Sequence, residues 1–206
     1  ELNGENCISI EELPQKKSIC TSRSFADEGI SDKNVMEEAV ANFAVRSTEK
    51  LRRQGSVCQG VTVFAWTSRF NDHVPEYTIH DSLVLPIATD AQDEIVGAAL
   101  TILRARYPKS VTDRPDRPDL SFRFKTAGVI LWQISPATPR EQDLFDPIDR
   151  ERQKALMAAI DAINRKNGYG TIRQAIQGTD CRFDLKREYM SKRFTTDISD
   201  ILEVKC

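Results

Sequence analysis

The order in which strand-forming and helix-forming stretches alternate constrains the fold of this chain more than any other feature. β-branched and aromatic residues dominate residues 57–70 (VCQGVTVFAWTSRF) and 122–134 (FRFKTAGVILWQI), which predicts two long strands. Apolar residues recur at helical spacing over residues 34–54 and 91–107, so an amphipathic helix precedes each long strand. Two further strands are predicted at residues 17–25 and 77–87, the latter as the hairpin partner of the first long strand.

This β-α-β-β-α-β order predicts a fold of the α+β class. We expect a two-layer sandwich, with a four-stranded antiparallel sheet and both helices on one face. The other face of the sheet is then left free for water or for a ligand. Along the first strand, Ile19 and Phe25 share a face with Thr21 and Arg23, and the residues between them point the other way.

The chain of 206 residues divides into a folded core and an appendage. Residues 1–16 are a polar lead-in, 17–136 hold the sandwich, 137–150 are a proline-rich linker, and 151–206 form a mainly helical C-terminal extension. A helix is predicted from about 149 to 167, with Leu156, Ala159, Ile160 and Ile163 on one stripe, and a short strand at 171–176. Because the chain starts with Glu1 rather than Met, we expect a piece of a longer protein.

Composition and motifs argue against several classes of function. The 29 Lys and Arg against 31 Asp and Glu give a net charge of −2, which disfavours a strongly basic nucleic-acid binder. The five cysteines form no Cys-x-x-Cys pair and the two histidines lack a neighbouring ligand, so no metal site is predicted. No apolar run approaches the ~18 residues needed to span a bilayer. Because no nucleophile–base pair is recognisable, we expect no catalytic residue and no cofactor in this chain.

Small hydroxyl and basic residues on three of the predicted strands are the candidate DNA-binding residues. Such side chains donate hydrogen bonds to phosphate oxygens, and these contacts position a protein without reading the base sequence. The candidates are Ser22, Arg23, Ser24, Thr67, Ser68, Arg69, Arg123 and Lys125. The residues alone leave open whether they form a DNA surface or an ordinary hydrated sheet face.

A short peptide in the linker is the second candidate interaction feature. It consists of Glu141, Gln142, Asp143, Leu144 and Phe145. Two adjacent large apolar residues in a proline-flanked linker have no local core to enter. They either fold back onto the domain or insert into a pocket of a partner as a short linear motif.

Five segments, in order along the chain, carry a resemblance to a known family. They are ELNGENC at the start, SRSF in the first strand, TAGVIL in the fourth, EQDLFD in the linker and MSKRFTTDISDILEVK at the end. Over nearly its whole length, the chain resembles the C-terminal part of the UmuC type of Y-family translesion DNA polymerase, the catalytic subunit of bacterial DNA polymerase V.

The resemblance implies that residues 17–136 are the little finger, the domain with which such polymerases grip the DNA backbone, and that residues 1–16 lead in from the thumb. By position, the hydroxyl and basic candidates match its DNA-contacting strands. The implied function is binding of damaged or primed DNA, without sequence specificity, during error-prone synthesis in SOS damage tolerance and repair. The magnesium-binding residues of such polymerases lie in the palm, which would precede Glu1, so nucleotidyl transfer belongs to the parent chain.

The resemblance also implies partners for the C-terminal third. The peptide 141–145 matches a sliding-clamp motif, with the Leu144–Phe145 anchor kept but Gln142 one place late. The extension from Asp149 onward is associated in this family with the cleaved UmuD dimer and with the recombinase filament. The implied location is the bacterial cytoplasm, with the nucleoid, and no membrane partner is expected. The alternative from another class is a stand-alone ferredoxin-like protein-interaction module that binds no DNA.

Overall fold

The computed structural model describes residues 16–25, 29–68, 76–108, 122–137, 148–179, 183 and 190–201. The elements are β1 (Ile19–Ser24), α1 (Lys33–Arg53), β2 (Ser56–Thr67), β3 (Thr78–Thr89), α2 (Gln92–Arg106), β4 (Phe124–Pro136), α3 (Arg150–Asn167) and the short 3₁₀ helices η1 (Ala175–Gln177) and η2 (Ile198–Asp200). The predicted β-α-β-β-α-β order and the α+β class are therefore confirmed.

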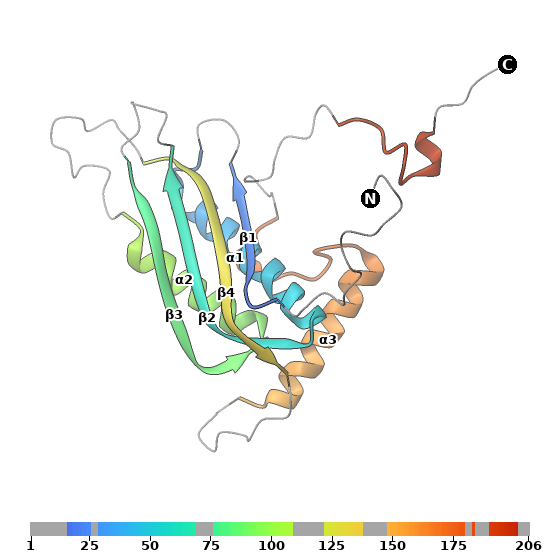
Figure 1. Ribbon diagram of the computed structural model, residues 1–206, viewed down its shortest axis with the longest axis horizontal. Helices are drawn as coiled ribbons and strands as arrows, with labels where there is room; N and C mark the ends of the chain where they lie inside the picture. Colours follow the sequence, from blue (N-terminus) through green and yellow to red (C-terminus); the bar gives the residue numbers. More distant parts are fainter. Residues whose placement is uncertain are drawn as a thin grey trace, which may run out of the picture.

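The four strands form one antiparallel sheet in the order β1-β4-β2-β3 (Figure 1). β4 lies in the interior, between β1 and β2, and β1 and β3 are the edge strands. The predicted hairpin between the second and third strands is present, with Phe64 opposite His80. As Figure 1 shows, α1 and α2 both lie against the same face of the sheet, which is the predicted two-layer arrangement.

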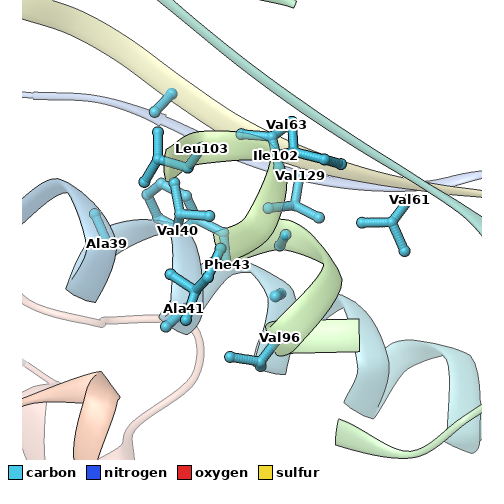
Figure 2. Close-up of a cluster of buried hydrophobic side chains, with 14 of the residues drawn as sticks. Ala39, Val40, Ala41, Phe43, Val61, Val63, Val96, Ile102, Leu103 and Val129 are labelled. Atoms are coloured by element: carbon cyan, nitrogen blue, oxygen red, sulfur yellow. The ribbon is translucent and has the colours of Figure 1, made fainter. Parts of the chain in front are cut away.

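The hydrophobic core fills the space between the two helices and this face of the sheet. Figure 2 shows Val40 and Phe43 of α1 and Leu103 of α2 directed towards Val63 and Val129 of the sheet. The side chains of all five are at most 1% exposed. Every second residue of the strands enters this core, so the pleat itself decides which side chains remain on the opposite face.

Both core helices begin close to the predicted positions, and they are joined across their exposed edge. The side chain of Asp32 accepts a hydrogen bond from the backbone N–H of Asn34 at 2.8 Å and caps α1. Glu37 of α1 accepts a hydrogen bond from Arg104 Nε of α2 at 3.0 Å. This hydrogen bond holds the pKa of Glu37 below its usual range, against the opposing effect of burial. We refer to these two residues as the α1–α2 ion pair.

The C-terminal extension packs back onto the helix layer. Asp161 of α3 accepts two hydrogen bonds from Arg52 of α1, both at 2.6 Å, and Phe183 is buried against the ring of Phe43 at 6.0 Å. None of the helices in the described part of the chain is long and apolar enough to cross a membrane.

The predicted short strand at 171–176 is wrong. The backbone N–H of Ile172 donates to the side-chain oxygen of Asn164 at 2.7 Å, and the carbonyl of Ile172 accepts from the same side chain at 3.0 Å. Because the side chain of a helical residue satisfies both backbone groups, this segment needs no partner strand, and it continues into η1.

Candidate nucleic-acid interface

The face of the sheet that the helices do not cover is called here the open face, and cross-strand pairing arranges its side chains in four rows. The rows are Ser24–Thr126–Trp66–Thr78, Ser22–Gly128–Phe64–His80, Cys20–Ile130–Thr62–Ser82 and Trp132–Gly60–Val84, each running across the sheet from β1 or β4 to β3. Residues at the alternate positions, such as Val63 and Val129, point into the core, which fixes the orientation of these rows.

Hydroxyl groups on the open face are paired across neighbouring strands. Ser24 Oγ and Thr126 Oγ1 lie 3.1 Å apart, and Thr62 Oγ1 and Ser82 Oγ lie 2.7 Å apart. Each hydroxyl has one proton and two lone pairs, so a pair that shares one hydrogen bond still has a second proton to donate. The pairs can therefore donate to an acceptor placed above the sheet.

Aromatic side chains fill the middle of the open face. The rings of Phe64 and Trp66 are stacked, with centroids 5.2 Å apart, and Trp66 is 42% exposed. Phe64 lies over Gly128, where a Cβ atom would come within 2.4 Å of its ring. Trp132 lies over Gly60 in the same way, at 2.3 Å. The glycines thus let the rings lie close to the backbone, so that the open face combines small hydroxyl groups with apolar rings.

The predicted DNA-binding residues do not all share this face. Ser22 and Ser24 lie on it, as predicted. Arg23 lies on the opposite face of β1, because side chains alternate along a strand. Thr67 is only 2% exposed, and its hydroxyl accepts a hydrogen bond from the backbone N–H of Tyr77 at 2.9 Å. Thr67 therefore closes the connection between β2 and β3 rather than facing a ligand.

The other predicted residues gather at one end of the sheet or lie outside the described residues. Ser68 follows the end of β2, Arg123 precedes β4, and all three of Ser68, Arg123 and Lys125 are partly exposed. Lys125 lies at an irregularity in the pairing, where Trp66 pairs with Thr126 but the next residue of β2 pairs with Phe124. Arg69 and the clamp-like peptide of Glu141, Gln142, Asp143, Leu144 and Phe145 lie outside the described residues.

Sequence reasoning missed the residues at the centre of the open face. Thr62, Phe64 and Trp66 alternate with the core-facing residues of β2, and Thr126 does so in β4; neighbouring side chains leave Thr62 and Phe64 only 6% and 8% exposed, whereas Trp66 is 42% exposed. The period of two was present in the sequence and could have identified them once the core-facing residues of these strands had been assigned. Among the described residues, no group of three or more His, Cys, Asp or Glu is placed to hold a metal ion.

Comparison with known proteins gives matches along most of the chain. Residues 16–144 match the C-terminal domain of the impB/mucB/samB family, and residues 154–204 match a domain of unknown function, DUF4113. The chain is 36% identical to Protein ImpB of Salmonella typhimurium over 203 residues, which cover 98% of this chain and 45% of that protein.

Two further relatives give similar values. Protein UmuC of Salmonella typhimurium is 35% identical over 207 residues, covering 100% of this chain and 46% of the relative. Protein MucB of Escherichia coli is 35% identical over 201 residues, covering 96% of this chain and 44% of the relative. The chain spans somewhat less than half the length of these relatives. On the strength of the match over residues 16–144, the chain belongs to the impB/mucB/samB family and contains its C-terminal domain.

Proposed function

We propose that this chain is the DNA-gripping and partner-docking region of an error-prone translesion DNA polymerase. In this proposal residues 17–136 are the little finger, 1–16 lead in from the thumb, 137–150 carry the clamp-binding motif, and 151–206 are a C-terminal extension that docks partners. Nucleotidyl transfer and its magnesium ions are assigned to the palm of the parent polymerase, and the complex acts in the bacterial cytoplasm.

The observation that carries the proposal is the composition of the open face at one end. The row Ser24–Thr126–Trp66–Thr78 lies beside Arg123 and Lys125. Hydroxyls donate to phosphate oxygens, and lysine and arginine add charge at the same end. A surface of this kind holds the DNA backbone but does not select a base sequence, which suits a polymerase that must pass over damaged bases.

The basic end of the open face gives the first test. We expect the chain to bind primed duplex DNA in a fluorescence anisotropy titration, with an affinity that falls as salt rises. The double variant Arg123→Ala with Lys125→Ala should lower the log–log salt slope by about 2, because each phosphate contact contributes about 0.9. The matched control is Arg152→Ala with Lys154→Ala, which removes the same charge from exposed positions on α3.

The two tryptophans give a second and more local readout. Trp66 is exposed on the open face, whereas the indole Nε1 of Trp132 is buried. In a Trp132→Phe variant the remaining emission reports on Trp66 alone, and DNA on the open face should quench it or shift it. Binding that leaves this emission unchanged would place the DNA elsewhere and overturn the assignment of the open face.

The alternative, a ferredoxin-like module that binds protein and not DNA, is favoured by the exposure of Trp66 and Val84, which are 42% and 54% exposed. It predicts no binding to primed DNA even at low salt.

The partners are tested separately. The double variant Leu144→Ala with Phe145→Ala should abolish binding to the sliding clamp and spare DNA binding. Binding of a cleaved UmuD-type dimer and of a recombinase filament is proposed for residues 151–206 and should survive the same double variant.

A further inference from the structure

A polar groove lies on the helix side of the sheet, away from the open face, where α1, β1 and the segment after α3 meet. It has a volume of about 340 Å³ and is lined by Thr21, Arg46, Glu49, Lys50, Arg53 and Tyr169. A smaller hollow of about 100 Å³ adjoins it and shares Glu49, Arg53 and Tyr169. There Arg165 of α3 joins the lining, together with Asp161 and Asn164.

Three cationic side chains form a stripe along the wall that α1 provides. Arg46, Lys50 and Arg53 are separated by four and three residues, so they project from one side of the helix. The stripe is about 10 Å long, because each helical residue adds about 1.5 Å. This length matches several consecutive phosphate groups rather than a single small anion.

The side-chain hydrogen bonds of Arg46 and Lys50 in this stripe do not neutralise their positive charge. Arg46 Nε donates to the hydroxyl of Tyr169 at 3.2 Å, and Lys50 Nζ donates to Thr21 Oγ1 at 3.1 Å. Both acceptors are neutral. Asp161, the carboxylate of the adjoining hollow, is held by the two hydrogen bonds from Arg52.

Glu49 is the other acidic side chain in the groove. Burial, followed by repulsion from Asp161, raises the pKa of Glu49 above its usual range. The charges of Arg53, Arg52 and Arg46 act in the opposite direction and favour the carboxylate form. With Arg46, Lys50, Arg53 and Arg165 against Glu49, the groove is positive overall.

Tyr169 adds an aromatic surface beside the charges. Tyr169 is 50% exposed, and the guanidinium of Arg46 lies over one side of its ring, 5.0 Å from the centroid. An aromatic ring next to a line of cations is the combination by which proteins bind nucleotides, since the base stacks on the ring and the phosphates meet the cations. An acidic peptide would use the cations but would leave the ring without a flat partner.

We propose that this groove binds the phosphate groups of a nucleotide or of a single nucleic-acid strand, with a base against Tyr169. The site goes beyond the open face, because the two surfaces lie on opposite sides of the sheet and use different residues. Each can therefore fail in an experiment without the other.

The test is a binding titration of the full chain with fluorescent oligothymidylate, in which nucleoside triphosphate, inorganic phosphate and polyglutamate compete. Lys50→Gln with Arg53→Gln should lower the log–log salt slope by about 1.4, since each phosphate contact on a single strand contributes about 0.7. Arg46 is kept, because it also holds Tyr169. The matched control is Arg152→Ala with Lys154→Ala, which removes the same charge from exposed positions on α3 outside the groove and should leave this slope unchanged.

The Glu49→Gln variant should bind more tightly, and a misfolded variant could not produce such an increase in affinity. Removing one negative charge about 7 Å from a phosphate in water should raise the affinity about threefold at low salt. Unlabelled oligothymidylate is added as a further competitor. If triphosphate displaces the probe at lower concentrations than unlabelled oligothymidylate does, the ligand is a free nucleotide; the reverse order identifies a strand. Displacement by polyglutamate alone, or binding that neither groove variant changes, would overturn the proposal.

Discussion

The ion pair between Arg52 and Asp161 joins α3 to α1, as Arg150 and Glu94 join its first turn to α2, and replacing Asp161 by Asn tests how much the first pair contributes. The side chains of Arg52 and Asp161 are only 9% and 22% exposed, and the guanidinium donates to both carboxylate oxygens at 2.6 Å. The third contact of Arg52 is a donation from Nη1 to the carbonyl oxygen of Asp90 at 3.1 Å. Asparagine keeps the size of the side chain but turns one acceptor into a donor that faces the guanidinium.

The expected loss follows from the hydrogen bonds and the burial. A hydrogen bond to a charged group contributes about 1.5–3 kcal/mol, and the variant loses one such bond while leaving a nearly buried positive charge without its counter-ion. The partial exposure of Asp161 reduces this value, so we expect the docking of α3 to weaken by about 2 kcal/mol. That corresponds to roughly a 30-fold larger undocked population.

Hydrogen exchange of the backbone amides measures this population directly. Amides of α3 should exchange about 30-fold faster in Asp161→Asn, whereas those of β4 should be unchanged, because the sheet does not depend on this contact. The control variant is Asp197→Asn, whose carboxylate instead accepts from Ser199 in the last part of the chain. A cycle with Arg52→Gln isolates the pairwise contribution. Unchanged exchange in α3, or a coupling near zero, would refute the reasoning.

Three further predictions concern the α1–α2 ion pair, the core and the open face. Replacing Glu37 by Gln breaks the α1–α2 ion pair and should lower the free energy of unfolding by about 1 kcal/mol at pH 7, a value kept small because the arginine is half exposed. The hydrogen bond from that arginine holds the pKa of Glu37 below the ordinary 4.5. This stabilisation is therefore present above pH 4.5 and is lost as the pH falls through the lower pKa of the folded state. If the urea unfolding curves of the wild type and the variant differ by the same amount at low pH as at pH 7, the prediction is wrong. Burial, with a contribution from a nearby carboxylate, raises the pKa of Cys58 to about 12, so a maleimide pulse read by mass spectrometry should label the exposed Cys20 and leave Cys58 unlabelled. Gly128→Ala would place a Cβ atom 2.4 Å from the ring of Phe64 and should destabilise the domain by about 1–3 kcal/mol in thermal unfolding; an unchanged midpoint would show that the ring can move away.

The fold was predictable because its signals are local. The runs of β-branched residues fall on β2 and β4, and the observed bounds of these strands, Ser56–Thr67 and Phe124–Pro136, differ from the predicted ones by a few residues. The division of β1 into a core face and an open face also followed from the sequence. What the prediction neglected was this same alternation when it grouped Arg23 with the serines on either side of it.

The burial of Thr67 could not be predicted from the alternation of side chains along the strand. The pairing shifts between Trp66 and Thr67, so Lys125 is an extra residue in β4 and the alternation does not run unbroken through the strand end. Such an irregularity depends on how two strands distant in sequence pair with each other, and no local sequence pattern predicts it.

The side of α3 that packs against the domain could not be predicted from the sequence either. Its apolar stripe, with Leu156 at 55% and Ile163 at 37% exposure, faces away from the domain, and Met157 is the buried residue of the helix. The usual reading of an amphipathic helix predicts the apolar side as the packed side. Here the packed side carries Asp161, whose partner is 109 residues away in the chain.

Because α3 is attached mainly through charged side chains, with Met157 as its buried apolar residue, it contributes little to the collapse that assembles the sheet and its two helices. Hydrophobic burial drives that collapse, whereas an ion pair such as Arg52–Asp161 forms only when both partners are already held in place. We therefore expect the sandwich to reach its native packing first and α3 to join it in a later kinetic phase. Stopped-flow refolding of the Asp161→Asn variant should then show an unchanged main phase and a later phase of reduced amplitude.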